Sequence, residues 1–295
     1  MTQQIKTAGQ TGRDHTVRTV RNILVHLFLA ILAAIWLFPL VWLILISFRN
    51  QTGSAVQGFI PASFTLGNYE QLLFDTNVLN FPRAFANTLF IALCSMTVST
   101  FFVLSVAFST SRLRFKMRRP LMNLGMILGL FPGFMAMIAV YYILRALGLT
   151  EGSMIRLALI LVYSGSSGLG FYIAKGFFDT IPKTLDEAAI LDGASRLQVF
   201  RHVTIPLSKP IIVYTVMTAF MGPWLDFVFA RVIIRADSRY DTVALILWRM
   251  LEQEYINRWF NSFMAGAVLV SIPIATVFLV MQRYYRENMG GAVKG

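Results

Sequence analysis

The chain has 295 residues, of which 56% are hydrophobic and only 14% are charged, and its formal net charge is +12. Soluble domains usually carry about a quarter charged residues. This composition therefore excludes an ordinary soluble globular protein and favours one that lies in a lipid bilayer. The single cysteine, Cys94, excludes a disulfide framework within the chain.

Six apolar stretches predict membrane-spanning helices, since about 20 mostly apolar residues are enough to cross the hydrocarbon core. They are residues 24–46, 84–111, 121–144, 157–174, 211–230 and 262–281. The first stretch is too long for the core of a signal peptide, so we expect it to be retained. The mixed run at 65–85 predicts an external loop with a short amphipathic helix. The expected fold is an all-α integral membrane protein, a six-span helical bundle, with a transmembrane domain (23–283) between an N-terminal tail (1–22) and a C-terminal tail (284–295).

The distribution of Lys and Arg indicates which ends of the spans face the cytoplasm. With the N-terminus inside, 17 of the 26 basic residues fall in the inner segments, which are the two tails and the loops at 112–119 and 175–209. Cytoplasmic loops carry an excess of Lys and Arg, so we expect both termini to be cytoplasmic. The five basic residues at 112–119 offer nucleic-acid binding as an alternative. Because two apolar spans flank them, membrane lipid is the expected partner and nucleic acid is not.

Ionisable side chains inside spans are costly and are therefore functional candidates. Asp226 is the only acidic residue near the interior of a span, two positions after Trp224. It either lines a substrate path, as Trp224 would, or pairs with Arg231 at the membrane interface. The spans hold no chain of carboxylates and histidines, which argues against an ion-coupled secondary transporter.

Prolines and glycines interrupt several spans. Each proline within a span removes one backbone hydrogen bond, and these prolines are Pro39, Pro132, Pro223 and Pro273. Glycines at every fourth position (Gly125, Gly129 and Gly133) and the small-residue run at 164–170 let other helices approach closely. Both patterns fit either tight packing or helices that move past one another.

The sequence contains no catalytic signature. It lacks the phosphate-cradling pattern G-x-x-x-x-G-K-[ST] and also H-E-x-x-H, C-x-x-C and G-x-S-x-G. We therefore expect neither an enzyme nor a bound cofactor or metal, and an integral-membrane enzyme is the disfavoured alternative. Any energy source must come from another subunit.

The segment at 184–210 predicts two short helices at an angle. Thr184 and Glu187 have the spacing of a capping box, which predicts a helix start near Leu185. Gly193 is expected to end that helix with a positive φ.

Ser195 and Gln198 repeat the capping spacing and predict the second helix, which Pro206 and Pro210 are expected to stop. The two helices share an apolar side made of Leu185, Ala188, Ala189, Leu197, Phe200 and Val203. This side either inserts into a groove of another protein or packs on the protein's own spans.

Three short motifs of this segment resemble a known family. They are Glu187-Ala188-Ala189, Asp192-Gly193-Ala194 and Ile205-Pro206-Leu207. In this order and spacing they resemble the EAA loop of the permease subunits of ABC importers. The resemblance implies a type I ABC-importer permease fold, in which residues 179–209 are a coupling loop that docks into a cleft of an ATPase subunit. The residues implied at that contact are Glu187, Ala188, Ala189, Asp192, Gly193, Ala194, Leu197 and Phe200.

Two further features resemble the sugar-uptake branch of that superfamily, the MalG-like maltose/maltodextrin permeases. The phrase at 220–227 is similar to a fifth-span pattern in which Trp is followed by Asn and an acid, although Leu225 replaces the usual Asn. The tail at 290–295 is similar to the end of those permeases, which implies that Gly290, Gly291 and Lys294 reach the ATPase interface.

The resemblance also implies a function and partners. The chain would form half of an alternating-access pore in a bacterial cell membrane, for maltose or maltodextrin, or alternatively for another oligosaccharide or a glycerol-phosphate-type substrate. The implied partners are a homologous permease subunit, two ATP-binding ABC subunits and an external sugar-binding protein. The loop at 232–261 would face the binding protein through its Trp248, Glu252, Tyr255 and Trp259, unless these aromatics form an interfacial belt.

Overall fold

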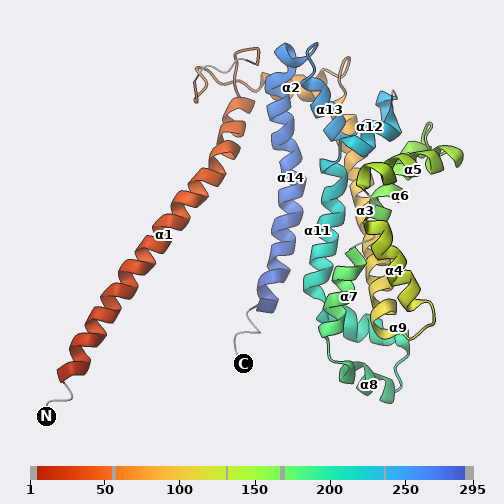
Figure 1. Cartoon of the computed structure of the whole chain (residues 1–295). Coiled ribbons are helices and arrows are strands. Elements are labelled where there is room, and N and C mark those ends of the chain that lie inside the picture. The colour runs from red at the N-terminus through yellow and green to blue at the C-terminus, as the bar shows by residue number, and fades with distance from the viewer. Residues whose placement is uncertain (1–4, 55–57, 131, 167–169, 236, 290–295) are drawn as a thin grey trace.

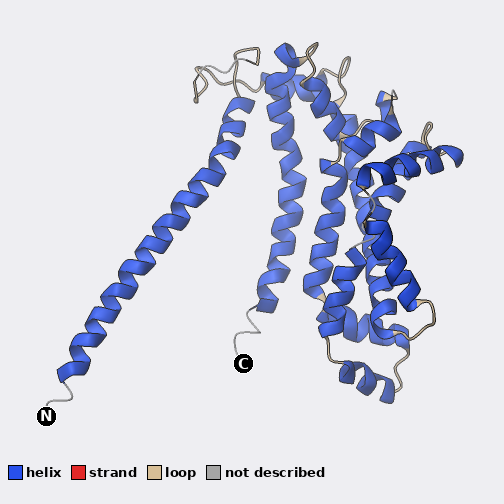
Figure 2. Ribbon diagram, viewed as in Figure 1, coloured by secondary structure: helices blue, strands red, loops and turns tan. Residues whose placement is uncertain are grey.

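The structure is a computed structural model that describes residues 5–54, 58–130, 132–166, 170–235 and 237–289. This part of the chain is helical and contains no strand, as Figure 2 shows, so the expected helical membrane bundle is confirmed. The helices, in chain order, are α1 (Ile5–Ser47), α2 (Gly67–Phe74), α3 (Phe81–Arg112), α4 (Arg118–Gly129), α5 (Gly133–Ala146), α6 (Met154–Ser166), α7 (Gly170–Thr180), α8 (Lys183–Leu191), α9 (Arg196–Val199), the π-helical turn η2 (Phe200–Thr204), α10 (Ile205–Leu207), α11 (Lys209–Leu225), α12 (Val228–Ile234), the 3₁₀ turn η3 (Ser238–Tyr240), α13 (Val243–Met250) and α14 (Ile256–Met289).

Three helices are long and apolar enough to cross a membrane unbroken, namely α1, α3 and α14. They contain the first, second and sixth expected spans. Three bent pairs of helices bring the possible total of spans to six within the described residues. In the fourth expected span, α6 and α7 differ in direction by 41°. The external loop at 65–85 contains the short helix α2, as expected.

The third expected span (121–144) is not one straight helix. Helices α4 and α5 meet at 107°, and Pro132 stands before α5 with an extended ψ of 124°. A proline cannot donate the backbone hydrogen bond that a continuous helix needs. The two helices therefore form a broken span or a re-entrant segment. Gly125, Gly129 and Gly133 are consequently divided between two helices instead of lining one face.

The fifth span is shorter than expected. Helix α11 ends at Leu225, before the expected end at 230, because the backbone of Asp226 is extended, with ψ of 116°. Pro223 lies inside α11 and does not end it. The chain then starts a new helix, α12, at Val228.

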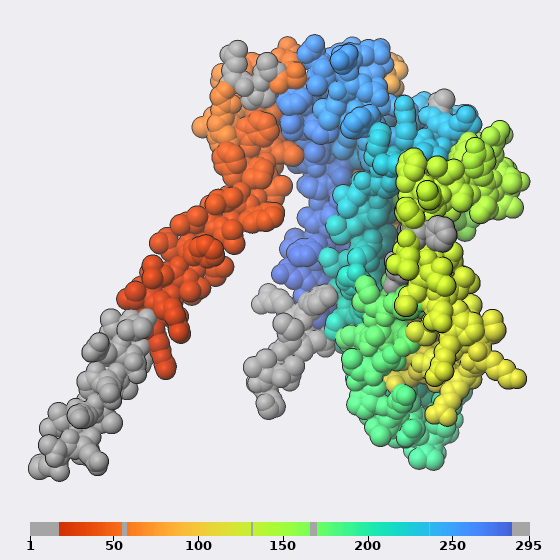
Figure 3. Space-filling model, viewed as in Figure 1, coloured from red at the N-terminus to blue at the C-terminus, as the bar shows by residue number. Residues whose placement is uncertain are grey.

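Helix α3 is the centre of the bundle and packs against α6, α7 and α11 (Figure 1). Helix α14 packs beside α11 and beneath α2 and α13. Here close approach favours Gly266, since a Cβ on it would lie 2.7 Å from Leu247 Cδ2 of α13 and 3.3 Å from the ring of Phe81. Helix α1 extends away from the bundle like an arm (Figures 1 and 3), and every side chain from 18 to 40 is exposed.

The segments counted as basic and inner lie at the same end of the molecule. Figure 1 shows the start of α1, the end of α14, the α3–α4 connection and helices α8 and α9 at this end. Helices α2 and α13 lie at the opposite end. The fold thus separates the basic segments from the loops at 65–85 and 232–261.

Candidate functional site

The start of helix α8 is not formed by the expected capping box. Pro182 is the residue before the helix, and no side chain caps the helix start. The capping box predicted for Thr184 and Glu187 is therefore wrong, because the helix starts at Lys183, two residues earlier than that box requires. Proline is well suited to this position, since its fixed φ favours a chain that turns into a helix.

The end of α8 follows the expectation for Gly193. Its φ is +89°, a left-handed conformation that favours glycine. The N–H of Gly193 donates to the carbonyl of Ile190 at 3.0 Å, and the N–H of Ala194 donates to that of Ala189 at 2.9 Å. These two bonds are the Schellman arrangement that satisfies the last carbonyls of a helix.

The second helix begins with the predicted capping box. The Ser195 N–H donates to Gln198 Oε1 at 2.7 Å, and the Gln198 N–H donates to Ser195 Oγ. The prediction that Pro206 stops this helix is wrong. The π-helical turn η2 precedes this proline, so the N–H of Ile205 reaches back to the carbonyl of Phe200, and the helix continues to Leu207.

The chain turns at Ser208, and the segment Arg196–Leu207 makes an angle of 85° with α11. Helices α8 to α10, residues 183–207, are called the knob below. The knob leads directly into α11 through the turn at Ser208.

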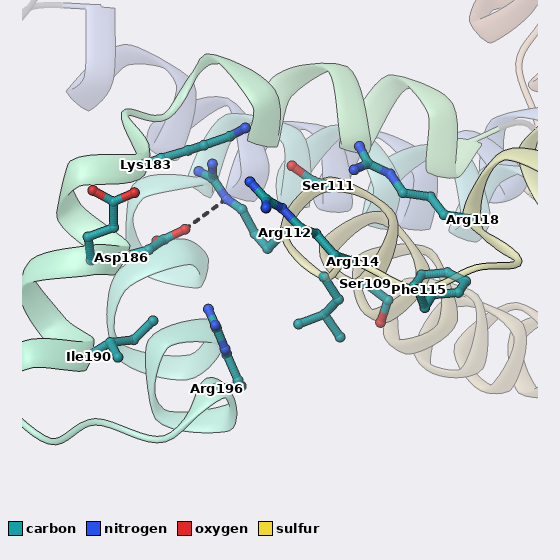
Figure 4. A pocket seen from close by; sticks show the side chains of 12 residues that line it. Ser109, Ser111, Arg112, Arg114, Phe115, Arg118, Lys183, Asp186, Ile190 and Arg196 are labelled. Carbon is teal, nitrogen blue, oxygen red and sulfur yellow. Dashed lines mark ion pairs between the residues drawn. The ribbon is translucent and has the colours of Figure 1, made fainter.

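A buried ion pair ties the knob to α3. Arg112, the last residue of α3, places its Nε 3.0 Å from Asp186 Oδ2 of α8 (Figure 4, dashed line). Its Nη2 also donates to the carbonyl of Ile181 at 2.9 Å. The two side chains are only 3% and 9% exposed. Removing one partner of such a pair would leave an uncompensated buried charge, which is costly.

The knob presents apolar side chains both inward and outward. Leu191 and Leu197 point away from the bundle, with 88% and 73% of each residue exposed. Phe200 lies against Phe108 of α3, with ring centroids 4.7 Å apart. Of the residues expected at an ATPase contact, Glu187, Ala188, Asp192, Gly193 and Leu197 are exposed, whereas Ala189, Ala194 and Phe200 are half-buried. Some residues of the apolar side are thus free to insert into a groove of another protein, whereas Phe200 packs on the protein's own spans.

Asp226, at the opposite end, is held by hydrogen bonds within the chain. Tyr163 donates its hydroxyl to Asp226 Oδ2 at 2.7 Å. The N–H groups of Phe229 and Ala230 donate to the same carboxylate at 3.2 and 3.1 Å. Asp226 therefore caps the start of α12, and no ion pair with Arg231 is found among the described residues. The pairing alternative is wrong.

Trp224 is part of the apolar core at this end of the bundle. It is 3% exposed, and its ring packs edge-on against Phe85 at 5.3 Å. Phe220 lies 5.9 Å away on the same helix. Trp224 thus positions the end of α11 between α3 and α14, and its proposed place on a substrate path stays a prediction.

Comparisons with known proteins agree with one another. The family model described as binding-protein-dependent transport system inner membrane component matches residues 102–290. The galactooligosaccharides transport system permease protein GanQ of Bacillus subtilis (strain 168) is 32% identical over 94% of this chain and 97% of its own length. The maltodextrin transport system permease protein MdxG of the same organism is 30% identical over 95% and 99%. A solved structure of a bacterial ABC transporter involved in the import of the acidic polysaccharide alginate includes a chain with 23% identity and a TM-score of 0.74, over 90% of this chain and 97% of that one.

The chain belongs to the inner membrane permeases of binding-protein-dependent transport systems. This permease is a sugar-uptake subunit of an ABC importer, which confirms the family expected from the EAA-like segment. It is a transport subunit and not an enzyme, since ATP hydrolysis in these importers occurs in a separate subunit. Among the described residues, no group of three His, Cys, Asp or Glu side chains could hold a metal ion.

The permease positions some predicted residues away from a partner surface. Trp259 is only 1% exposed, so it packs in the core and cannot face a binding protein. Trp248 is exposed and its ring lies 4.8 Å from that of Phe227. The tail residues Gly290, Gly291 and Lys294 lie outside the described residues, as does part of the small-residue run at 164–170.

The Arg112–Asp186 pair is a feature of this permease that sequence reasoning missed. Arg112 belongs to a basic cluster that the positive-inside rule already explains, and Asp186 merely precedes the Glu-Ala-Ala triplet. One available signal was an arginine directly after an uncharged span together with an acid in the first turn of a nearby helix. That signal names both residues but does not show that they meet.

Proposed function

We propose that the knob is the coupling element of this importer, with α8 docked in a cleft of an ATP-binding ABC subunit. The observation that carries the proposal is that the knob has exposed apolar side chains and, at another point, a buried attachment to the bundle. Leu191 and Leu197 are exposed, while Asp186 is anchored to α3. The knob is attached to α3 through Asp186 of α8 and leads into α11 through α10, so it passes a push from a bound partner into two membrane helices.

We also propose that a homologous permease subunit completes the pore and that both termini are cytoplasmic. The packing of α1 supports the first part, because its side chains from 18 to 40 are exposed, and the ring contact of Phe38 with Phe59 leaves Phe38 exposed as well. The gathering of basic segments at the knob end supports the second. Two ATPase subunits would act at that end, and an extracellular or periplasmic sugar-binding protein would dock near α2 and α13.

The proposed substrate is a neutral oligosaccharide, with maltodextrin first and a galactooligosaccharide as the alternative. The relatives named for these two sugars support this class. The site at Asp226 is compatible with it, since both carboxylate oxygens already accept hydrogen bonds from Tyr163 and from backbone N–H groups. Uptake by membrane vesicles with a panel of these sugars and alginate oligosaccharides distinguishes the substrates.

Affinity purification of Leu197→Asp tests the coupling role. A charge on this exposed leucine should be expelled from an apolar cleft, so an ABC ATPase should co-purify with the unaltered permease and be lost with the variant. Leu66→Asp is the matched control, because Leu66 is 62% exposed at the opposite end of the molecule. Equal retention of the ATPase by both variants would contradict the proposal.

A further inference from the structure

A cavity of about 860 Å³ lies between the knob and the α3–α4 connection (Figure 4). Its lining is rich in basic side chains, which come from α3, the α3–α4 connection, α4 and the knob. The basic residues are Arg112, Arg114, Arg118, Lys183 and Arg196, against two acidic residues, Asp186 and Glu187. The cavity is therefore lined by a net charge of +3, which favours an anionic ligand.

Arg112 adds a specific donor to this lining. Its side chain is 97% buried, its Nε lies 3.0 Å from Asp186 Oδ2, and its Nη2 donates to the carbonyl of Ile181. Arg112 Nε and Asp186 Oδ1 make no hydrogen bond to the described residues, and neither does Arg112 Nη1. Buried polar groups are almost always hydrogen-bonded, so this N–H group indicates a missing acceptor in the cavity.

An apolar groove of about 530 Å³ continues from the cavity along the membrane part of the bundle. The two share Ser109 and Phe115 in their linings. Beyond these residues the groove runs between α3, α4 and α7, where it is lined by Phe101, Val106, Leu121 and Phe171 among others. A cationic cavity that opens into an apolar groove fits a molecule with an anionic head and a hydrocarbon tail.

The position of the site along the chain matches such a molecule. Arg112 is the last residue of one apolar helix and Arg118 is the first residue of the next. Both therefore lie at a membrane–water boundary, where the phosphates of phospholipids are found. Basic pockets between membrane helices on the cytoplasmic side are suited to anionic headgroups.

We propose that this site binds one anionic phospholipid, with its phosphate in the basic cavity and an acyl chain in the groove between α3, α4 and α7. The phosphate accepts hydrogen bonds from Arg114, Arg118 and the free Nη1 of Arg112. Because Arg112 also holds Asp186, the bound lipid stabilises the attachment of α8 to α3. The lipid is thus a structural ligand of the knob.

Native mass spectrometry of the purified importer, exchanged between phosphatidylcholine and phosphatidylglycerol nanodiscs, tests this proposal. The double variant Arg114→Gln/Arg118→Gln should retain phosphatidylglycerol roughly 10- to 30-fold less well, since each basic residue near a headgroup contributes about 1 kcal/mol. The matched control is Lys116→Gln/Arg119→Gln, which removes the same charge from the same segment but outside the cavity lining. Equal losses in the two double variants would overturn the site, because they would indicate general surface attraction.

A second variant separates a lipid from a free anion. Ser109→Phe places a ring where cavity and groove meet, so it should displace the lipid while the basic cavity remains. We expect phosphatidylglycerol to raise the Tm of the unaltered importer. Inorganic phosphate should give a smaller increase, both in the unaltered importer and in the Ser109→Phe variant. Equal protection by phosphate would overturn the lipid assignment. The lipid assignment would also be overturned if Arg114→Gln/Arg118→Gln retained phosphatidylglycerol but lost the ATPase. Carboxylates of the ATPase would then be the groups that fill the cavity.

Discussion

The knob and the connection between α11 and α13 (residues 226–242) are both places where the chain leaves a membrane helix and folds back. The knob is built from local bonds, such as those of Gly193 and Ser195. The connection is held by distant residues, since Asn87 Nδ2 donates to the carbonyls of Arg239 and Asp241 at 3.0 and 3.1 Å.

From this difference we expect one part to move as a unit and the other to stay with the bundle. The knob keeps its shape by itself and touches the bundle through a small anchored surface, so it can move as a unit when a partner moves it. The α11–α13 connection has its polar groups bonded to α3 and α6, so it is expected to stay with the bundle. The following variants should break one region without the other.

The largest effect is expected from Asp186→Ala. It leaves the Arg112 guanidinium buried without its partner, and breaking a buried pair typically costs about 3–5 kcal/mol. The knob should detach from α3, so transport should be lost in vesicle uptake assays while the spans still insert. Glu151→Ala removes the same charge from an exposed position outside the knob and should transport normally. If the double variant Arg112→Met/Asp186→Leu fails to recover any transport, the pair does more than hold α8.

A smaller loss is expected from Gly193→Val. A β-branched residue at φ of +89° strains the turn by about 1–3 kcal/mol, which tilts α9 relative to α8. ATP hydrolysis by the assembled importer should then proceed with little sugar uptake, or the ATPase should bind weakly. Gly193→Asn should be milder, because asparagine tolerates left-handed backbone better. The control is Gly176→Val, in α7 with open space around it. Normal coupling in Gly193→Val would show that the turn is not needed.

In the α11–α13 connection, Asp226→Ala should reduce stability by about 0.5–2 kcal/mol, the usual cost of losing a helix cap. Thermal melting of the purified permease should show this loss, and Asp226→Asn, which keeps one acceptor oxygen, should show less. A capping role leaves the sugar concentration for half-maximal uptake unchanged. A large change in that concentration with an unaltered Tm would instead favour a carboxylate on the substrate path.

The smallest effect is a pH dependence at Asp241. Burial raises its pKa to about 6 despite the nearby guanidiniums of Arg249 and Arg231. The folded state therefore holds this proton more tightly than the unfolded state, and the stability contributed by Asp241 falls as pH rises from about 4 to 6. The Tm of Asp241→Asn relative to the unaltered permease should accordingly increase over that range. Asp237→Asn is the opposite control, because a hydrogen bond from Arg239 lowers the pKa of Asp237. If the Tm differences of both variants changed with pH in the same way, the raised pKa of Asp241 would be contradicted.

The features that the sequence could predict depend on local contacts, and those it could not predict depend on contacts between distant residues. Gly193 and the Ser195–Gln198 box were predictable because their partners lie within a few residues. The buried Arg112–Asp186 pair and the bonds of Asn87 were not, because they depend on which helices meet. Pro132 and Pro223 illustrate the limit within helices. Both were expected to perturb a span, yet one precedes a 107° bend and the other lies inside a continuous helix.

Site-directed crosslinking from Leu197 tests the central claim that the knob docks on an ATPase subunit. The experiment uses Leu197→Cys with Cys94→Ser in the assembled importer, and Leu66→Cys in the same background as the control. We predict a thiol-dependent adduct between Leu197→Cys and an ABC ATPase, and none from Leu66→Cys. Failure of Leu197→Cys to form this adduct in an importer that still transports sugar would contradict the account.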